Sequence, residues 1–130
     1  MFKKRQESPS GKFLNFELIK EENGIFFFEI IFPPETASPL NLVQGGMIDA
    51  ALDEATSMTA YIAFKEEKLP LTTDHHVLFH RPMSLGKATM QTKIIKYGKT
   101  VTTIEGKLFD QNEKLVATML HTALPTNIPK

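Results

Sequence analysis

Cysteine is absent from the 130 residues, which excludes disulfide bonds and thiolate metal sites. The formal net charge is zero, so no excess of positive charge points to a nucleic acid or an anionic membrane. No apolar run approaches the ~20 residues that a membrane-spanning helix needs. The basic residues near the N-terminus are not followed by the apolar segment of a secretory signal. We therefore expect a cytoplasmic protein with neither a nucleic acid nor a membrane among its partners.

The remaining composition is ordinary for a globular protein, with 42% hydrophobic and 23% charged residues. A chain of this length forms one domain with a substantial core. We expect a flexible N-terminal segment over residues 1–12, a single domain over residues 13–124 and a C-terminal tail over residues 125–130. The polar composition of the first segment and the two prolines of the last one motivate these boundaries.

The stretch NLVQGGMIDAALDEATSMTAYIAF, residues 41–64, organises the chain. A glycine pair, Gly45 and Gly46, precedes a run without glycine or proline, and the run has the i, i+3, i+4, i+7 apolar spacing of a helix with one buried stripe. We expect this helix to continue to about Glu66. Small residues such as Ala50 in its first turns allow another element to pack very close to it.

Alternating or apolar segments flank the predicted helix. Two strands are expected before it, over residues 13–20 and 25–32, joined by an Asn-Gly turn. Four more follow it, over residues 72–80, 87–96, 100–110 and 114–122, separated by turn residues. The order β-β-α-β-β-β-β predicts an α+β fold in which one antiparallel sheet curls around the helix.

This order and three motifs resemble the hotdog fold. VQGGMIDAALDEA resembles the signature of acyl-CoA thioesterases of the PaaI-like and 4-hydroxybenzoyl-CoA types, in which His-Gly-Gly precedes a helix with an acidic residue. DHHVLFHRPMSLG resembles the next strand of that family, and KYGKT its turn between long strands. The resemblance covers roughly residues 13–122 and implies an antiparallel sheet wrapped around one long central helix.

The resemblance also implies roles for particular residues. The backbone N–H of Gly45 would bind the thioester carbonyl, Asp53 would be the catalytic nucleophile or general base, and Thr72 would orient water. Gln44 stands where the family has histidine, and it can donate a hydrogen bond but does not titrate near neutrality. Ser38 stands at a frequent asparagine position. The expected substrate-binding residues are Ser38, Asn41, Gly46, Met47, His76 and Lys99.

The residues support this chemistry independently. A helix N-terminus presents unpaired N–H groups with a partial charge of about +0.5, and two glycines let a carbonyl oxygen approach them closely. That is the arrangement of an oxyanion hole. Eight helical residues, however, rise about 12 Å, so Gly45 and Asp53 of one chain cannot reach the same reacting bond. If both act, the carboxylate comes from a second subunit, which predicts a homodimer with two shared sites, or a homotetramer built from it.

Less specific interpretations stay open for several of these residues. The glycine pair could be only a turn, and Asp53 only a solvated helix residue. Asp49, one turn before Asp53, is either exposed or a helper that acts by like-charge repulsion. Glu54 is expected at the surface. Three lysines at strand ends, Lys93, Lys96 and Lys99, are either a solvated edge or a contact to CoA phosphates.

The histidines do not indicate a metal site. Asp74, His76 and His80 are expected on one face of a strand, with His75 on the other. His76 and His80 would stand ~13 Å apart, too far to share an ion. Asp74 and His76 could share one, but no third ligand is evident nearby. His75 or His76 could instead line a pocket. We expect no metal and no redox cofactor, with CoA entering only as part of the substrate.

The sequence therefore predicts an acyl-CoA thioesterase that acts on a small or medium acyl- or aryl-CoA. The alternative is a non-catalytic acyl-CoA or lipid-binding hotdog protein, which Gln44 favours. A hydratase is a weaker alternative, because it would need a histidine paired with an acid where the motif has Gln44. The acyl group, and a choice between CoA and an acyl carrier protein, are left open by the sequence.

Overall fold

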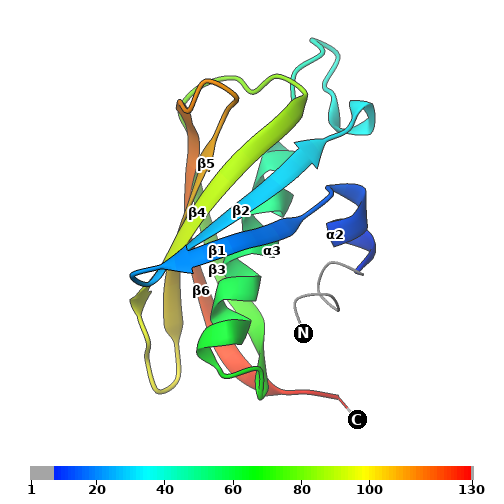
Figure 1. The fold of residues 1–130 in the computed structure, drawn as a ribbon. Helices are drawn as coiled ribbons and strands as arrows, with labels where there is room; N and C mark the ends of the chain where they lie inside the picture. Colours follow the sequence, from blue (N-terminus) through cyan, green and yellow to red (C-terminus); the bar gives the residue numbers. More distant parts are fainter. Residues whose placement is uncertain (1–7, 130) are drawn as a thin grey trace.

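The computed structural model describes residues 8–129, in which six strands form one antiparallel sheet around a long helix (Figure 1). The strands pair in the order β1-β2-β4-β5-β6-β3. This confirms the predicted α+β hotdog architecture. The elements are α2 (Pro9–Phe13), β1 (Glu17–Glu22), β2 (Ile25–Phe32), η1 (Pro34–Thr36), α3 (Gly45–Ala63), β3 (Lys68–Phe79), β4 (Gly86–Lys96), β5 (Thr102–Phe109) and β6 (Leu115–Asn127). Within the described residues, no helix is long and apolar enough to cross a membrane.

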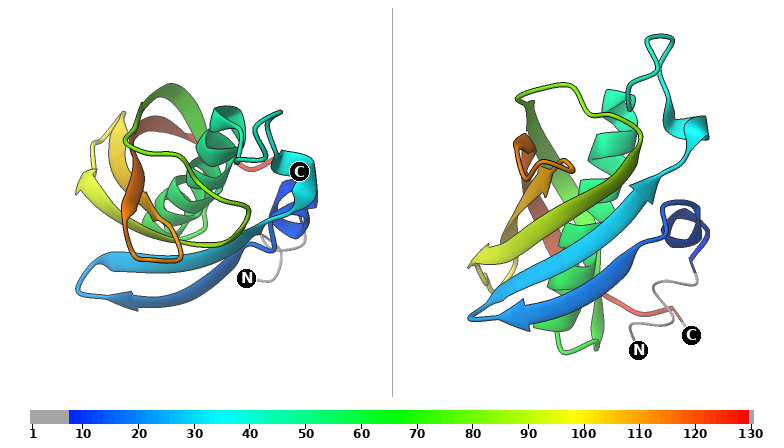
Figure 2. Two further views of the ribbon diagram at one scale, coloured as in Figure 1. Left: turned by 90° about the horizontal axis from the view of Figure 1, so that it is seen from above. Right: turned by 45° about the horizontal axis from the view of Figure 1, so that its top comes forward.

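The long helix α3 lies along the concave side of the sheet (Figure 2). Its apolar stripe, which includes Ile48, Leu52, Ala55 and Met58, is fully buried against the strands. The helix ends at Ala63, three residues before the expected end. Lys65 and Glu66 follow it with φ of 55° and 61°, and this left-handed backbone terminates the helix.

The helix and the sheet approach each other most closely at Gly106 of β5. A Cβ on that residue would lie 2.9 Å from Cγ2 of Thr56 and 3.2 Å from Cδ2 of Leu52. Any larger residue would push against α3, so the glycine allows the helix to sit this low on the sheet. The large buried side chains of the neighbouring strands, among them Phe28, Met90, Leu108 and Met119, fill the space on either side of that contact.

Strand β3 is an edge of the sheet and pairs with β6. Its pairing shifts between Thr72, opposite Ala123, and Asp74, opposite Thr122, so that Thr73 is an extra residue. This β-bulge reverses the alternation of side chains on one side of it. Thr72 and His75 are an odd number of residues apart, yet both contact the buried ring of His121 and therefore face α3.

The two ends of the domain differ from the expected boundaries. Residues 9–13, expected to be a flexible segment and the start of a strand, form helix α2, which Ser8 caps by accepting a hydrogen bond from the Gly11 N–H at 3.2 Å. Strand β1 accordingly begins only at Glu17. At the other end β6 continues to Asn127, through part of the expected tail, by pairing with β3. Residues 1–7 lie outside the described part of the chain.

Glu54 is buried, which corrects its expected place at the surface. Its side chain lies beneath the N-terminal part of the chain, where the Ser10 hydroxyl donates a hydrogen bond to Oε1. The correction has a simple cause. A helix of this length is covered by the sheet on one side, and α2 folds over part of what remains.

Candidate active site

The N-terminus of α3 carries two unoccupied backbone donors. Among the described residues, no hydrogen bond involves the N–H of Gly45 or Gly46, and the N-cap residue Gln44 makes no capping bond with its exposed side chain. The ring of Phe79, from β3, lies beside the first of these residues, 3.6 Å from where a Gly45 Cβ would be. A Cβ on Gly46 would meet nothing within 4 Å. The predicted donor group is therefore accessible and borders an aromatic side chain.

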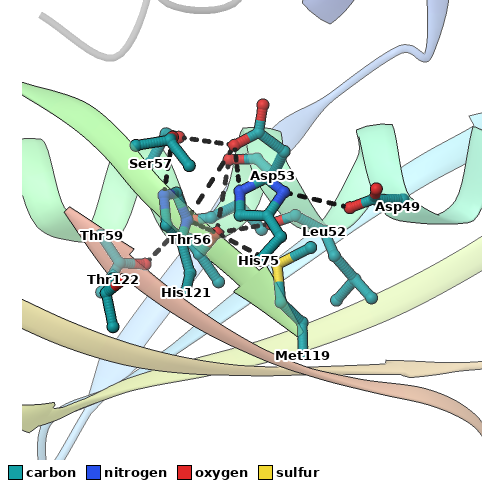
Figure 3. A network of polar contacts seen from close by, with 12 residues as sticks. Asp49, Leu52, Asp53, Thr56, Ser57, Thr59, His75, Met119, His121 and Thr122 are labelled. Atoms are coloured by element: carbon teal, nitrogen blue, oxygen red, sulfur yellow. Dashed lines mark hydrogen bonds and ion pairs between the residues drawn. The ribbon is translucent and has the colours of Figure 1, made fainter. Parts of the chain in front are cut away.

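Asp53 projects from α3 into a polar network with β3 and β6 (Figure 3). The Ser57 hydroxyl, one turn further along α3, donates to its Oδ1 at 3.1 Å. Nε2 of His75 lies 3.1 Å from the same oxygen, and Nδ1 of His121 lies 3.9 Å from it. Every hydrogen bond and ion pair of this carboxylate within the described residues therefore converges on Oδ1. Oδ2 therefore has no partner within the described residues and can contact a bound ligand.

His75 bridges two acidic residues of the helix. Its Nδ1 lies 3.3 Å from Oδ1 of Asp49, one helical turn before Asp53. The ring also meets that of His121 edge-on, with 4.3 Å between the ring centroids and 82° between the planes. Asp49 therefore contacts a histidine that also contacts Asp53, and its like-charge effect on the Asp53 carboxylate stays a prediction.

His121 is completely buried, and both of its ring nitrogens have hydroxyl partners. Nδ1 lies 2.7 Å from Oγ1 of Thr56 and Nε2 lies 2.9 Å from Oγ1 of Thr72. Burial, and then the neighbouring charge of His75, lower the pKa of His121 from 6.5 to about 4, with Asp53 opposing the shift. The imidazole is therefore neutral at physiological pH. Thr72, which was expected to orient water, is a hydrogen-bond partner of this ring.

Asp53, His75 and His121 place three possible ligand atoms within 4.8 Å of one another, which is the spacing of a metal site. The grouping joins residues of α3, β3 and β6, so the spacing of ligands along a single strand does not predict it. The hydrogen bonds nevertheless favour a different use of the cluster. A cation would have to displace the contact between Thr56 and His121, since no nitrogen of that ring is without a partner.

The other predicted binding residues are distributed differently. His76 is exposed on the opposite face of β3 from His75, as the strand pleat requires, so His75 and not His76 contacts Asp53 of the same chain. Ser38 and Asn41 shape the loop before α3: the Ser38 N–H donates to Leu42 at 2.6 Å, and Asn41 has a φ of 60°. Met47 packs against the core, and Lys99 is exposed in the loop between β4 and β5.

Two residues of the network carried a signal that sequence reasoning overlooked. Ser57 is four residues after Asp53, the spacing at which helical side chains meet. His121 occupies an inward position of β6, alternating with the buried Met119 and Ala123. A histidine in such an apolar series is buried and needs hydrogen-bond partners. The hydrogen-bond partners of such a histidine depend on which strands are adjacent. Because β3 and β6 are far apart in sequence, the partners of His121 could not be named in advance.

The comparisons with known proteins agree with the predicted fold and family. A model of the thioesterase superfamily matches residues 40–117, which run from the loop before α3 into β6. A proposed esterase of Saccharolobus solfataricus is 29% identical over 106 residues, covering 82% of this chain and 75% of that protein.

Solved structures are similar over nearly the whole chain. A phenylacetic acid degradation-related protein of Ralstonia eutropha JMP134 is 25% identical, with a TM-score of 0.84 and coverage of 91% of this chain and 89% of that one. A thioesterase of Haemophilus influenzae has a TM-score of 0.89 at 17% identity, covering 99% and 90%. A Streptococcus mutans protein bound to acetyl CoA has a TM-score of 0.77 at 17% identity, covering 91% and 94%. The last two share the fold with this chain.

Proposed function

The chain belongs to the thioesterase superfamily and is a thioester hydrolase, and from this premise we propose that it cleaves small or medium acyl- or aryl-CoA thioesters to the free acid and CoA. The observation that carries the proposal is the state of Asp53. Its carboxylate is partly exposed and held through Oδ1, while Oδ2 faces no partner within the described residues. This is how a carboxylate must be held to act on a reacting group from one side.

The proposed reaction uses Asp53 and the glycine donors together. The N–H of Gly45, with the partial positive charge of the α3 N-terminus, binds the thioester oxygen as negative charge develops on it. The Gln44 amide donates a further hydrogen bond. Asp53 either attacks the carbonyl carbon or takes a proton from the water that attacks it. When Asp53 acts as the base, the C–S bond then breaks and the departing CoA thiolate takes up the proton that Asp53 removed from water. When Asp53 is the nucleophile, the thiolate leaves behind an acyl–Asp53 anhydride. Water then hydrolyses this anhydride to the free acid and the Asp53 carboxylate, and the second proton of that water goes to the thiolate.

A second copy of the chain is needed for both groups to reach one substrate. Gly45 and Asp53 stand eight residues apart on the uninterrupted helix α3, a rise of about 12 Å. The helix also exposes Gly46 and Ala50, one turn apart. Small exposed side chains on such a face allow an antiparallel α3 of a partner to approach closely. We therefore propose a homodimer in which Asp53 of one subunit serves the glycine donors of the other.

The thioester itself would lie among apolar groups. Phe79 is 53% exposed beside Gly45, so it presents a ring surface to an incoming acyl or pantetheine chain. Met47 is partly buried one turn into the same helix end. Such side chains suit several acyl groups, because methionine adapts its shape and an aromatic ring accepts flat or extended chains. No cofactor takes part, since CoA belongs to the substrate.

Release of free thiol from a panel of acyl- and aryl-CoAs tests the proposal. Wild type should hydrolyse a subset of the panel, and Asp53→Asn should lower turnover by at least ~100-fold, the lower end of the effect of a general base. Asp74→Asn is the matched control, because Asp74 is an exposed carboxylate on β3. Its turnover should equal that of wild type. Binding of acyl-CoA without turnover would identify a binding protein and overturn the proposed reaction.

A further inference from the structure

His75 lies between two carboxylates, and the number of protons among the three groups follows from this placement. Its Nδ1 is 3.3 Å from Asp49 and its Nε2 is 3.1 Å from Asp53. A neutral imidazole has one N–H, so its second nitrogen would direct a lone pair at a carboxylate oxygen. Both contacts are attractive only when the three groups together hold two protons.

Burial makes this proton count a strong requirement. Nε2 of His75 and Oδ1 of Asp49 are shielded from solvent, and within the described residues neither makes a well-aligned hydrogen bond. Their distances are those of ion pairs, which depend on opposite charges rather than on direction. A neutral ring would leave buried polar atoms facing one another without compensation, which is costly. A protonated ring satisfies both sides at once.

His121 does not compete for that proton. The Thr56 hydroxyl donates its one proton to the Leu52 carbonyl at 2.8 Å, so its oxygen accepts from the Nδ1–H of His121. Nε2 of the same ring then accepts from the Thr72 hydroxyl. This neutral, fully hydrogen-bonded ring lies edge-on against His75 and holds it in place. The titratable groups that face His75 are thus Asp49 and Asp53 from α3 and His121 from β6.

We propose that Asp49, His75 and Asp53 form one proton-holding unit in which His75 is the positioning residue of the Asp53 carboxylate. The ring holds Oδ1, while Oδ2 is directed at the substrate. Asp49 secures the far side of the ring and acts only through it. During hydrolysis His75 keeps its proton: the proton from water passes to Oδ2 of Asp53 and then to the CoA thiolate. This inference rests on the proposed thioesterase reaction.

Steady-state kinetics test the positioning role. His75→Gln should lower kcat by about 10- to 100-fold, because a carboxylate displaced from its reacting position loses up to about 100-fold in rate, with KM little changed. Asp49→Asn should lower kcat as well, but should add nothing in the His75→Gln background, since its effect passes through the ring. His80→Gln is the matched control: this exposed histidine bonds Thr118 instead, and its kcat should equal that of wild type. Additive losses, an unchanged kcat or a change in KM alone would overturn the role.

A 15N NMR spectrum of the ring nitrogens reads the protonation of His75 at pH 7 without any catalysis. Both nitrogens of His75 should give the signal of a protonated nitrogen. His121, whose pKa is lowered to about 4 first by burial, should instead show one protonated and one bare nitrogen at this pH. A bare nitrogen on His75 at pH 7 would refute the unit. Lack of turnover by wild type would refute only the proposed function. If His75→Gln does not fold, Asp49→Asn tests the positioning role, because this variant should fold and have a lowered kcat. An unchanged kcat of Asp49→Asn would then overturn the role.

Discussion

The buried His121 should make the stability of this protein depend on pH in a defined window. Its pKa is lowered from 6.5 to about 4 in the folded state, first by burial. The unfolded chain therefore takes up a proton near pH 6.5, while the folded protein takes it up only near pH 4. Stability from this group is fully present above pH 6.5 and is lost as the pH falls toward 4, with no further loss below it.

The size of the effect follows from the shift. The difference between 6.5 and about 4 corresponds to about 3 kcal/mol of unfolding free energy. One proton sets an upper limit on the slope of about 1.4 kcal/mol per pH unit, which is approached in the middle of the window. Urea denaturation at one protein concentration, repeated from pH 7 to pH 4.5, measures this slope before most carboxylates titrate.

His121→Leu provides the comparison, because the leucine leaves no buried hydroxyl without a partner. Thr56 still donates to the Leu52 carbonyl at 2.8 Å, and Thr72 is exposed. All other titrating groups are common to both proteins, so the difference between the two profiles isolates His121. We expect the variant to be less sensitive to acid than wild type. Parallel profiles between pH 6.5 and 4.5 would refute the assignment of a buried neutral histidine.

Two further substitutions test the packing of α3. Gly106→Ala should lower the unfolding free energy by about 1–3 kcal/mol in urea, because its Cβ would lie 2.9 Å from Thr56, whereas Gly46→Ala meets nothing within 4 Å and should cost less. Equal stability of these two variants would contradict the close approach of helix and sheet. Ala50→Arg should separate the proposed dimer in size-exclusion chromatography and abolish hydrolysis while circular dichroism stays native, since Ala50 is exposed on α3. A variant of unchanged size and activity would exclude pairing through this helix.

The sequence by itself determined the long helix and the six strands of this fold and one half of its candidate site. The apolar spacing after Gly45 and Gly46 predicts α3, and the alternating segments with turn residues between them predict all six strands. These signals are local, because a helix or strand shows its buried face in its own periodicity. The positions of Asp53 and the glycine pair follow from the same helix, so the candidate donor group and the candidate carboxylate could be named from the sequence.

Only the tertiary structure decided what surrounds Asp53. Strand order brings His121 of β6 beside β3, and the bulge at Thr73 turns both Thr72 and His75 toward α3, where alternation alone would separate them. Neither the adjacency of distant strands nor an extra residue in one of them leaves a mark in local periodicity. The packing of α2 over Glu54 likewise leaves no mark in local periodicity. Strand order and register determine which side chains of different elements meet. The partners of the Asp53 carboxylate therefore follow from the tertiary structure and not from the sequence pattern.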